Sequence, residues 1–347
     1  MAAPPPWLPR AVAALKNADC LLLHAGAGMG VDSGLPDFRG PQGFWRAYPP
    51  MKELVRARSR LRAWRAPRPR PKPFLGTNAS APSDALVSVS WQGLEFSEVS
   101  NPRSFQKDPR FGWGFFGHRY QLYSSAQPHE GYHVLRRWGE AARASYAVFT
   151  SNVDGHFLRA GFPERRVYEC HGSIHYLQPL DPRLGTAIWP AEPHLAGLRV
   201  DPATFLADAD TLPYCPPESG GAAGTLARPN ILMFGDYGFA PERTAAQQER
   251  YDAVVETWNK SARVVVIEIG AGLAIPTVRH ASEYVLEDFP NATLLRINPA
   301  EPKGPGNTIS IPMGGLEALT MLDAAIGGAA GIGSGDNAGD ASCADGR

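Results

Sequence analysis

The sequence predicts an α/β protein built on a doubly wound parallel sheet. Short apolar stretches typical of buried strands recur along the chain, and helical patterns separate them. The glycine-rich and polar segments follow these stretches, where the carboxyl ends of the strands would lie. Ligands of such sheets bind at that edge, so we expect the chemistry of the chain there.

The predicted elements alternate in order along the chain. Residues 11–17 are expected to form a short helix that leads into a strand over Cys20 to His24. Residues 133–143 place Val134 and Trp138 on one face, as an amphipathic helix does. The further predicted strands are Tyr146 to Phe149, Arg166 to Glu169, Ile231 to Phe234, Val264 to Ile269 and Ala292 to Ile297.

A glycine-rich run follows the first strand. It reads His24-Ala25-Gly26-Ala27-Gly28-Met29-Gly30 and continues to Pro36-Asp37-Phe38-Arg39. Glycines at a strand end let backbone amides approach a diphosphate closely, although a tight turn between strand and helix is the alternative. The later proline, carboxylate, aromatic and guanidinium offer more chemistry than a connection needs. The run therefore predicts a nucleotide pocket in a Rossmann-like fold.

Charge and hydropathy exclude several classes of partner. The 347 residues include 34 Lys plus Arg and 34 Asp plus Glu, so the formal net charge is zero and no global field attracts nucleic acid. No apolar run is long enough to span a membrane, and the first six residues lack the pattern of a secretory signal. We expect an intracellular protein, cytoplasmic or nuclear, with neither a membrane nor a nucleic-acid partner.

The four cysteines are scattered. Cys20, Cys170, Cys215 and Cys343 form no Cys-x-x-Cys pair, so neither a disulfide framework nor a complete thiolate zinc site can be written. We predict no metal. The alternative is a zinc ion held by Cys215 with borrowed histidine or carboxylate ligands.

Several motifs follow one another in a fixed order. Their residues are Gly34-Leu35-Pro36-Asp37-Phe38-Arg39, Thr150-Ser151-Asn152-Val153-Asp154, His171-Gly172-Ser173, Arg228-Pro229-Asn230-Ile231-Leu232-Met233-Phe234-Gly235 and Gly270-Ala271-Gly272. Together they resemble the signatures of the sirtuins, which are NAD-dependent protein deacylases. The resemblance covers roughly residues 8–322 and implies NAD as the cofactor.

The resemblance implies catalytic roles for three residues. His171 is expected to act as general base, because an imidazole titrates near neutrality and can take a proton from a ribose hydroxyl. Asn152 would hold the ribose and a water, and Asp154 would help to bind nicotinamide or to order the loop. An Asx turn that closes the strand is the alternative for this pair. The other histidines considered, which are His24, His118, His156 and His175, are expected to be packing or surface residues.

The remaining site residues are also implied by the resemblance. Phe234 and Gly235 are expected to line the peptide groove, and Phe38 to cover the reacting carbon after nicotinamide leaves. The expected cofactor contacts are Gly26, Ala27, Gly28, Asp37, Phe38, Arg39, Ser151, Asn152, Asp154, Gly270, Ala271, Gly272 and Asn298.

The chain departs from the family pattern in two ways. Ser151 stands where the family has a glutamine that touches the ribose, so that contact must be lost or replaced by water. Most sirtuins carry a structural zinc held by two cysteine pairs. Here the first pair is missing from residues 178–182, and the second is reduced to Cys215.

The resemblance also implies the domain organisation. The catalytic domain spans 8–322, with a Rossmann-like lobe of residues 8–40, 130–172 and 228–322. A smaller lobe comprises 41–129 and 173–227. Within it, residues 56–92 are rich in arginine and proline, and we expect them to be disordered, either as a tolerated insertion or as an anion-binding arm. The tail 323–347 is also expected to be disordered.

The expected activity is NAD-dependent deacylation of protein lysine. It would give nicotinamide, free lysine and O-acyl-ADP-ribose, and the partner would be a protein that carries an acylated lysine; the oligomeric state is left open. The same bond cleavage would serve a protein mono-ADP-ribosyltransferase or an NAD glycohydrolase. A catalytically silent NAD-binding protein is a third reading, which the presence of His171, Asn152 and Asp154 disfavours.

Overall fold

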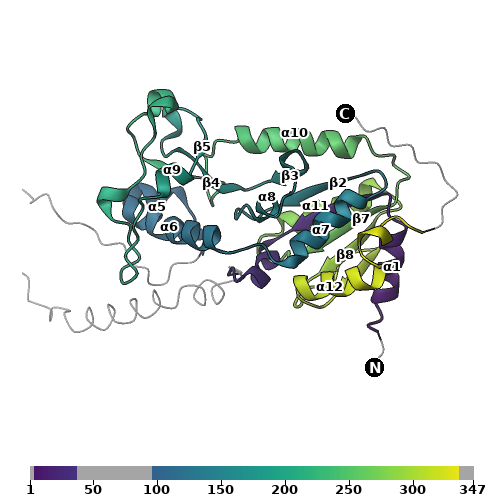
Figure 1. Cartoon of the computed structure of the whole chain (residues 1–347). Helices are drawn as coiled ribbons and strands as arrows, with labels where there is room; N and C mark the ends of the chain where they lie inside the picture. The colour runs from purple at the N-terminus through teal and green to yellow at the C-terminus, as the bar shows by residue number, and fades with distance from the viewer. Residues whose placement is uncertain (1–3, 37–95, 336–347) are drawn as a thin grey trace, which may run out of the picture.

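The computed structural model describes residues 4–36 and 96–335 (Figure 1). Three of the expected cofactor residues, Asp37, Phe38 and Arg39, lie outside the described residues, as do the arginine- and proline-rich segment and residues 336–347. Within the described ranges, no helix has both the length and the apolar character needed to cross a membrane.

A six-stranded parallel sheet forms the larger lobe, in the order β3-β2-β1-β7-β8-β9. Its strands are β1 (Cys20–Ala25), β2 (Ser145–Thr150), β3 (Val167–Glu169), β7 (Val264–Ile269), β8 (Thr293–Ile297) and β9 (Thr308–Ile311). The chain winds outward from β1 in one direction and from β7 in the other. The topological switch point, where such folds bind ligands, therefore lies between β1 and β7. The predicted fold class is confirmed.

Helices cover both faces of this sheet (Figure 1). On one face, α1 (Leu8–Lys16), α7 (Glu130–Ala141) and α12 (Gly315–Ile326) pack against Leu21 and Leu23. On the other face, α10 (Glu242–Glu256) and α11 (Thr277–Asp288) pack near Leu22. This alternation follows the two-residue period of a strand, and it gives the sheet two apolar cores.

The predicted helices over 11–17 and 133–143 correspond to α1 and α7, and both begin three residues earlier than predicted. Local capping explains these starts. A proline occupies the first turn of α1, and the His129 side chain accepts a hydrogen bond from Gly131 N at the start of α7.

The smaller lobe contains a three-stranded antiparallel sheet in the order β5-β4-β6. Its strands are β4 (Gly172–Pro179), β5 (Trp189–Pro190) and β6 (Ala227–Ile231), and its helices include α4 (Phe96–Val99), α5 (Pro102–Lys107), α6 (Pro109–Ser125) and α9 (Glu192–Leu195). Aromatic side chains of α6, among them Trp113 and Phe116, share one apolar core with Ile174 and Leu177 of β4. The lobe is therefore held together by packing.

The predicted strand over Ile231 to Phe234 is wrong in position and in partner. The observed strand β6 ends at Ile231 and pairs antiparallel with β4, so the larger lobe does not resume at residue 228. Its buried polar side chains concealed it: Arg228 pairs with Asp236, and Asn230 Nδ2 donates to Gln178 Oε1 at 3.0 Å. Burial of satisfied polar groups leaves no apolar pattern in a sequence.

The predicted disorder from residue 323 onward is wrong for residues 323–335. Helix α12 continues to Ile326, and Ile332 is buried in the core beside α1. Gly333 N donates to Leu15 O at 3.1 Å, and Gly335 N donates to Lys16 O at 2.7 Å. The segment is ordered by backbone hydrogen bonds and close packing of small residues, which its composition does not reveal.

Candidate active site

Two glycine turns meet at the switch point, one after β1 and one after β7. Gly28 N donates to Gly270 O at 3.0 Å. A Cβ on Gly26 would lie 2.8 Å from Gly270 O, and a Cβ on Gly270, whose φ is +65°, would lie 2.4 Å from Gly28 Cα. Glycine is thus required at these contacts by close backbone approach, and at Gly270 also by the left-handed conformation.

A cavity of about 320 Å³ opens beside these turns and is bounded by both lobes. The structure brings most of the predicted site residues to its wall. These are Gly26, Ala27, Ser151, Asn152, Asp154, His171, Phe234, Gly270, Ala271 and Gly272. Residues from positions 26 to 272 therefore converge on one space.

Of the predicted residues that the structure describes, three do not line this cavity. Gly28 packs against Gly270, and Gly235, with φ +62°, forms the turn after Phe234. Asn298 is fully buried: its Nδ2 donates to Ala271 O at 2.8 Å, and its Oδ1 accepts from Ala300 N and Glu301 N at 3.0 Å. The side chain of this expected cofactor contact supports the loop after β7 from behind.

Asn152 is fixed at the end of β2 by hydrogen bonds on both sides. Its backbone N donates to Thr150 Oγ1 at 3.0 Å, and its Nδ2 donates to Gly26 O at 3.0 Å. Thr150 Oγ1 in turn donates to Ala25 O at 2.9 Å. The residue is thereby held in one orientation against the first glycine turn, at the cavity wall.

Asp154 forms a turn and also faces the cavity. Its Oδ1 accepts a hydrogen bond from His156 N at 2.9 Å, which is the Asx turn that begins the short helix α8 (His156–Arg159). The residue also lines the cavity. Burial raises the pKa of its carboxyl, and the His156 amide opposes that rise.

His171 lies between the two sheets, after β3 and directly before β4. Its carbonyl accepts a hydrogen bond from Leu232 N at 2.9 Å, and its Nε2 lies 3.4 Å from Thr277 Oγ1 at the start of α11. Burial lowers the pKa of the imidazole below its usual 6.5. The ring is therefore neutral at pH 7, the state in which it can accept a proton.

Arg119 and Tyr123 on α6 are among the residues of the cavity wall that were not predicted from the sequence. The guanidinium donates to Tyr123 Oη through Nη2 at 2.7 Å and Nε at 3.1 Å, and it lies 5.3 Å from the centre of the Phe115 ring. Both side chains are buried. The sequence signal for this pair was an arginine four residues before a tyrosine, in a helical stretch rich in aromatic residues.

The histidines expected to have no catalytic part do not line the cavity. His24 is buried under α11, with Nδ1 2.9 Å from Ser282 Oγ and Nε2 3.1 Å from Tyr251 Oη. Burial lowers its pKa to about 3. His118, His156 and His175 also do not line the cavity, which His171 does.

The described residues contain no group of three or more His, Cys, Asp or Glu side chains placed to hold a metal ion. Cys215 is a buried free thiol whose Sγ lies 3.5 Å from Thr225 Oγ1. The expected absence of a metal stays a prediction.

Comparisons with known proteins agree with this architecture. The model of the Sir2 family matches residues 89–264, half of the chain. The chain is 24% identical to an NAD-dependent protein deacylase of Aeropyrum pernix, over 90% of this chain and 95% of the relative. It is 27% identical to one of Deinococcus radiodurans, over 82% and 89%. A solved Sir2 homologue–NAD complex is 18% identical, with a TM-score of 0.57 and coverage of 91% and 93%. The chain belongs to the Sir2 family.

Proposed function

We propose that this chain is an NAD-dependent protein-lysine deacylase. One observation carries the proposal: the neutral imidazole of His171 lies on the same cavity wall as Asn152 and as the glycine turns after β1 and β7. Family membership and the names of the relatives point to the same activity.

The residues of the cavity fit a dinucleotide. Gly26, Gly270 and Gly272 present backbone without side chains at the switch point, which leaves room for a diphosphate. When bound, NAD supplies the glycosidic bond whose cleavage frees nicotinamide and exposes a ribose carbon to the acyl oxygen of the modified lysine. With water, the complete reaction gives nicotinamide, lysine and O-acyl-ADP-ribose.

His171, Asn152 and Asp154 would each have a different role in this reaction. His171 would accept a ribose hydroxyl proton, which lets that oxygen attack the acyl carbon. Asn152, fixed against Gly26, would hold the ribose and a water at the reacting carbon. Asp154, buried and held by the His156 amide, would bind the nicotinamide amide or keep the loop in shape. Ser151 is too short for the contact that a glutamine would make, so a bridging water would replace it.

The acylated lysine would enter from the side of the smaller lobe. Leu232, Met233 and Phe234 line that part of the cavity, and Leu232 and Phe234 are partly exposed at its edge. Their apolar surface suits an alkyl chain passing between the lobes. Arg119 and Tyr123 lie on the same wall, so both neutral and carboxylated acyl groups belong in the substrate test.

The test incubates the purified protein with NAD and an acyl-lysine peptide, and follows three quantities together. These are the peptide mass, released nicotinamide and ADP-ribosylation of protein. Loss of the acyl mass with an equal amount of nicotinamide supports deacylation. Nicotinamide release without peptide would show NAD hydrolysis instead, and labelled protein would show ADP-ribosyl transfer. No turnover with retained NAD binding would show a silent binder.

We also propose that the protein acts inside the cell, in the cytoplasm or the nucleus, without a nucleic-acid partner. None of the three described cysteines takes part in a disulfide bond, which suits a reducing compartment. The zero formal net charge supplies no overall attraction for nucleic acid. Fractionation of cells that express the tagged chain tests the location.

A further inference from the structure

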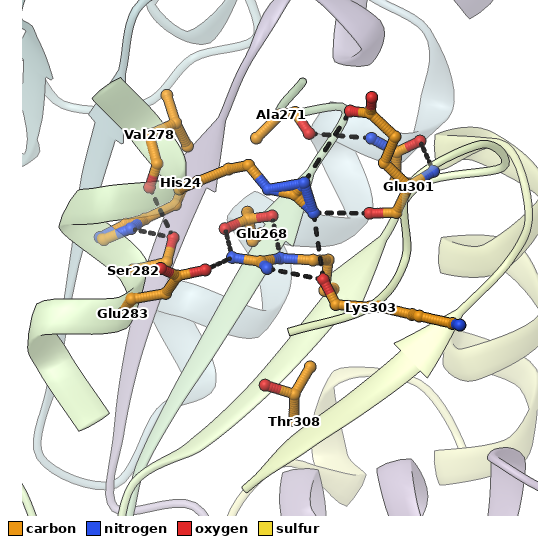
Figure 2. A network of polar contacts seen from close by, with 12 residues as sticks. His24, Glu268, Ala271, Val278, Ser282, Glu283, Glu301, Lys303 and Thr308 are labelled. Carbon is orange, nitrogen blue, oxygen red and sulfur yellow. Dashed lines mark hydrogen bonds and ion pairs between the residues drawn. The ribbon is translucent and has the colours of Figure 1, made fainter. Parts of the chain in front are cut away.

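A buried network of charged side chains lies beneath the second glycine turn (Figure 2). Arg296 on β8 donates from Nε and Nη2 to the two carboxylate oxygens of Glu268 on β7, at 2.6 and 2.9 Å. Its Nη2 also lies 2.9 Å from Glu283 Oε1 on α11. Arg296 and Glu268 are both fully buried. The network therefore joins strands β7 and β8 to helix α11 on one face of the sheet.

The same network holds the segment that follows β8. Arg279 on α11 donates from Nη2 to Glu301 O at 2.6 Å and to Lys303 O at 3.2 Å, and Arg296 Nη1 donates to Lys303 O at 2.9 Å. Arg279 is also buried, with its Nη1 3.8 Å from Glu301 Oε2. Arg279 thus holds both the backbone carbonyl and the carboxylate of Glu301, and Arg279 and Arg296 together hold the carbonyl of Lys303.

Glu301 in turn holds the loop after β7. Its Oε2 accepts a hydrogen bond from Leu273 N at 2.9 Å. Glu301 and Ala271 of this loop are shown in Figure 2. Asn298 donates to Ala271 O at 2.8 Å from the same segment. The two contacts flank Gly272, which lines the cavity. The loop that faces the cavity is therefore tied to the β8 segment on both sides of Gly272.

After Gly272, apolar packing contributes little to holding the loop in its conformation. The side chain of Leu273 is 63% exposed and that of Ile275 is 41% exposed. A loop with such exposed apolar side chains gains little from burial, and its conformation depends on its polar contacts. Glu301 supplies the contact to Leu273 N.

We propose that Glu301, fixed by Arg279, is a positioning residue that presets the loop 270–275 for the dinucleotide before it binds. The identity of the ligand rests on the proposed function. Neither residue lines the cavity, so the effect acts through the loop rather than by contact. If only a fraction of molecules holds the competent loop, the apparent dissociation constant rises by the inverse of that fraction.

Two substitutions and one matched control test this. Glu301→Ala removes the acceptor for Leu273 N and the partner of Arg279, whereas Glu301→Gln keeps an acceptor oxygen without the charge. The control is Asp19→Ala, which directly precedes the amino end of β1, whereas the cavity lies at the carboxyl ends of the strands. Asp19 Oδ2 also accepts from a backbone amide and a guanidinium, those of Arg263, both at 3.0 Å. Asp19→Ala therefore removes the same kinds of contact as Glu301→Ala, at a residue that does not line the cavity.

Amide hydrogen exchange over residues 270–276 without NAD, and direct NAD titration, are measured for each variant. We expect Glu301→Ala to speed exchange and raise the NAD dissociation constant, each about 10-fold, with a smaller change for Glu301→Gln and none for Asp19→Ala. The KM for peptide should stay unchanged.

The outcomes separate this inference from the proposed function. Unchanged exchange in Glu301→Ala overturns the inference, and a weaker NAD affinity without faster exchange would indicate direct contact instead. Faster exchange with unchanged affinity also overturns it, as does an equal effect of Asp19→Ala. If the unmodified protein binds NAD but deacylates nothing, the proposed function fails while the inference stands or falls on these two measurements.

Discussion

The side-chain amide of Asn152 donates a hydrogen bond to the backbone carbonyl of Gly26 at 3.0 Å. The two residues follow neighbouring parallel strands, β2 and β1, and lie 126 positions apart in the sequence. The bond joins a polar residue proposed for catalysis to the turn proposed for the diphosphate. It therefore sets the spacing between the two halves of the site.

The Asn152→Ala variant should lose this link. The buried Gly26 carbonyl would keep the hydrogen bond from Met29 N and lose the one from Asn152, which costs about 0.5–1.5 kcal/mol. We expect kcat/KM for NAD to fall at least about 10-fold and the melting temperature to drop by a few degrees. Nicotinamide release and thermal unfolding measure the two effects. Asn291→Ala, which removes an exposed side-chain donor to Ser261 O, is the control and should preserve the activity.

The His171→Ala variant should bind NAD almost as well as the unmodified protein and lose turnover. Removal of a general base costs about 10² to 10⁴ in rate, whereas the glycine turns that would hold the diphosphate are unaffected. Direct NAD titration and single-turnover peptide deacylation measure the two properties. His280→Ala, on the exposed side of α11, is the matched control. Comparable turnover of His171→Ala and the unmodified enzyme would refute the assigned role.

The pH dependence of kcat/KM should reflect the burial of His171. Because burial lowers the pKa of this imidazole, it stays neutral to a lower pH than an exposed histidine would. Activity should therefore be retained at pH 6.5 and fall at a pH below that value, as the ring becomes protonated and can no longer accept a proton. A pH–rate profile with a neutral acyl peptide measures the acidic limb. A midpoint above 6.5 would contradict the assignment.

Protein stability should also depend on pH, through His24. Its folded-state pKa of about 3 lies below the ordinary value of 6.5, so between these values the unfolded chain binds a proton that the folded chain does not. Stability from this group is fully present above pH 6.5 and declines by about 1.4 kcal/mol per unit as pH falls toward 3. Denaturant unfolding from pH 7 to 4 measures the slope. His24→Gln should lower that slope by about 1.4 kcal/mol per pH unit, which corresponds to one bound proton. An unchanged slope would contradict this account.

The Gly270→Ala variant should separate the two glycine turns. The new Cβ would lie 2.4 Å from Gly28 Cα, and φ +65° is strained for alanine. Overpacking and strain of this kind cost about 1–3 kcal/mol each. We expect a lower melting temperature and at least about 10-fold weaker NAD binding. Gly197→Ala, where a Cβ meets nothing within 4 Å, is the control and should leave both unchanged.

The sequence by itself determined the parallel α/β sheet and the order of the polar segments at its carboxyl edge. Both are local properties: apolar stretches such as Val264 to Ile269 predict buried strands, and glycines after them predict turns. Because parallel strands end at a common edge, the segments around Gly26, Asn152, His171 and Gly270 had to converge there. Their convergence on one cavity required no knowledge of individual contacts.

Only the tertiary structure decided which residues face that cavity and which support it. Asn298 ends a predicted strand as expected, yet its side chain bonds to Ala271 O and is fully buried. Arg228 and Asn230 belong to an antiparallel strand that their polarity concealed, because their partners Asp236 and Gln178 lie elsewhere in the sequence. Hydrophobic periodicity reports whether a residue is buried, but it does not identify the partner of a buried polar group, which for Asn230 lies 52 positions away. No local pattern encodes such a contact, and the folded chain alone supplies it.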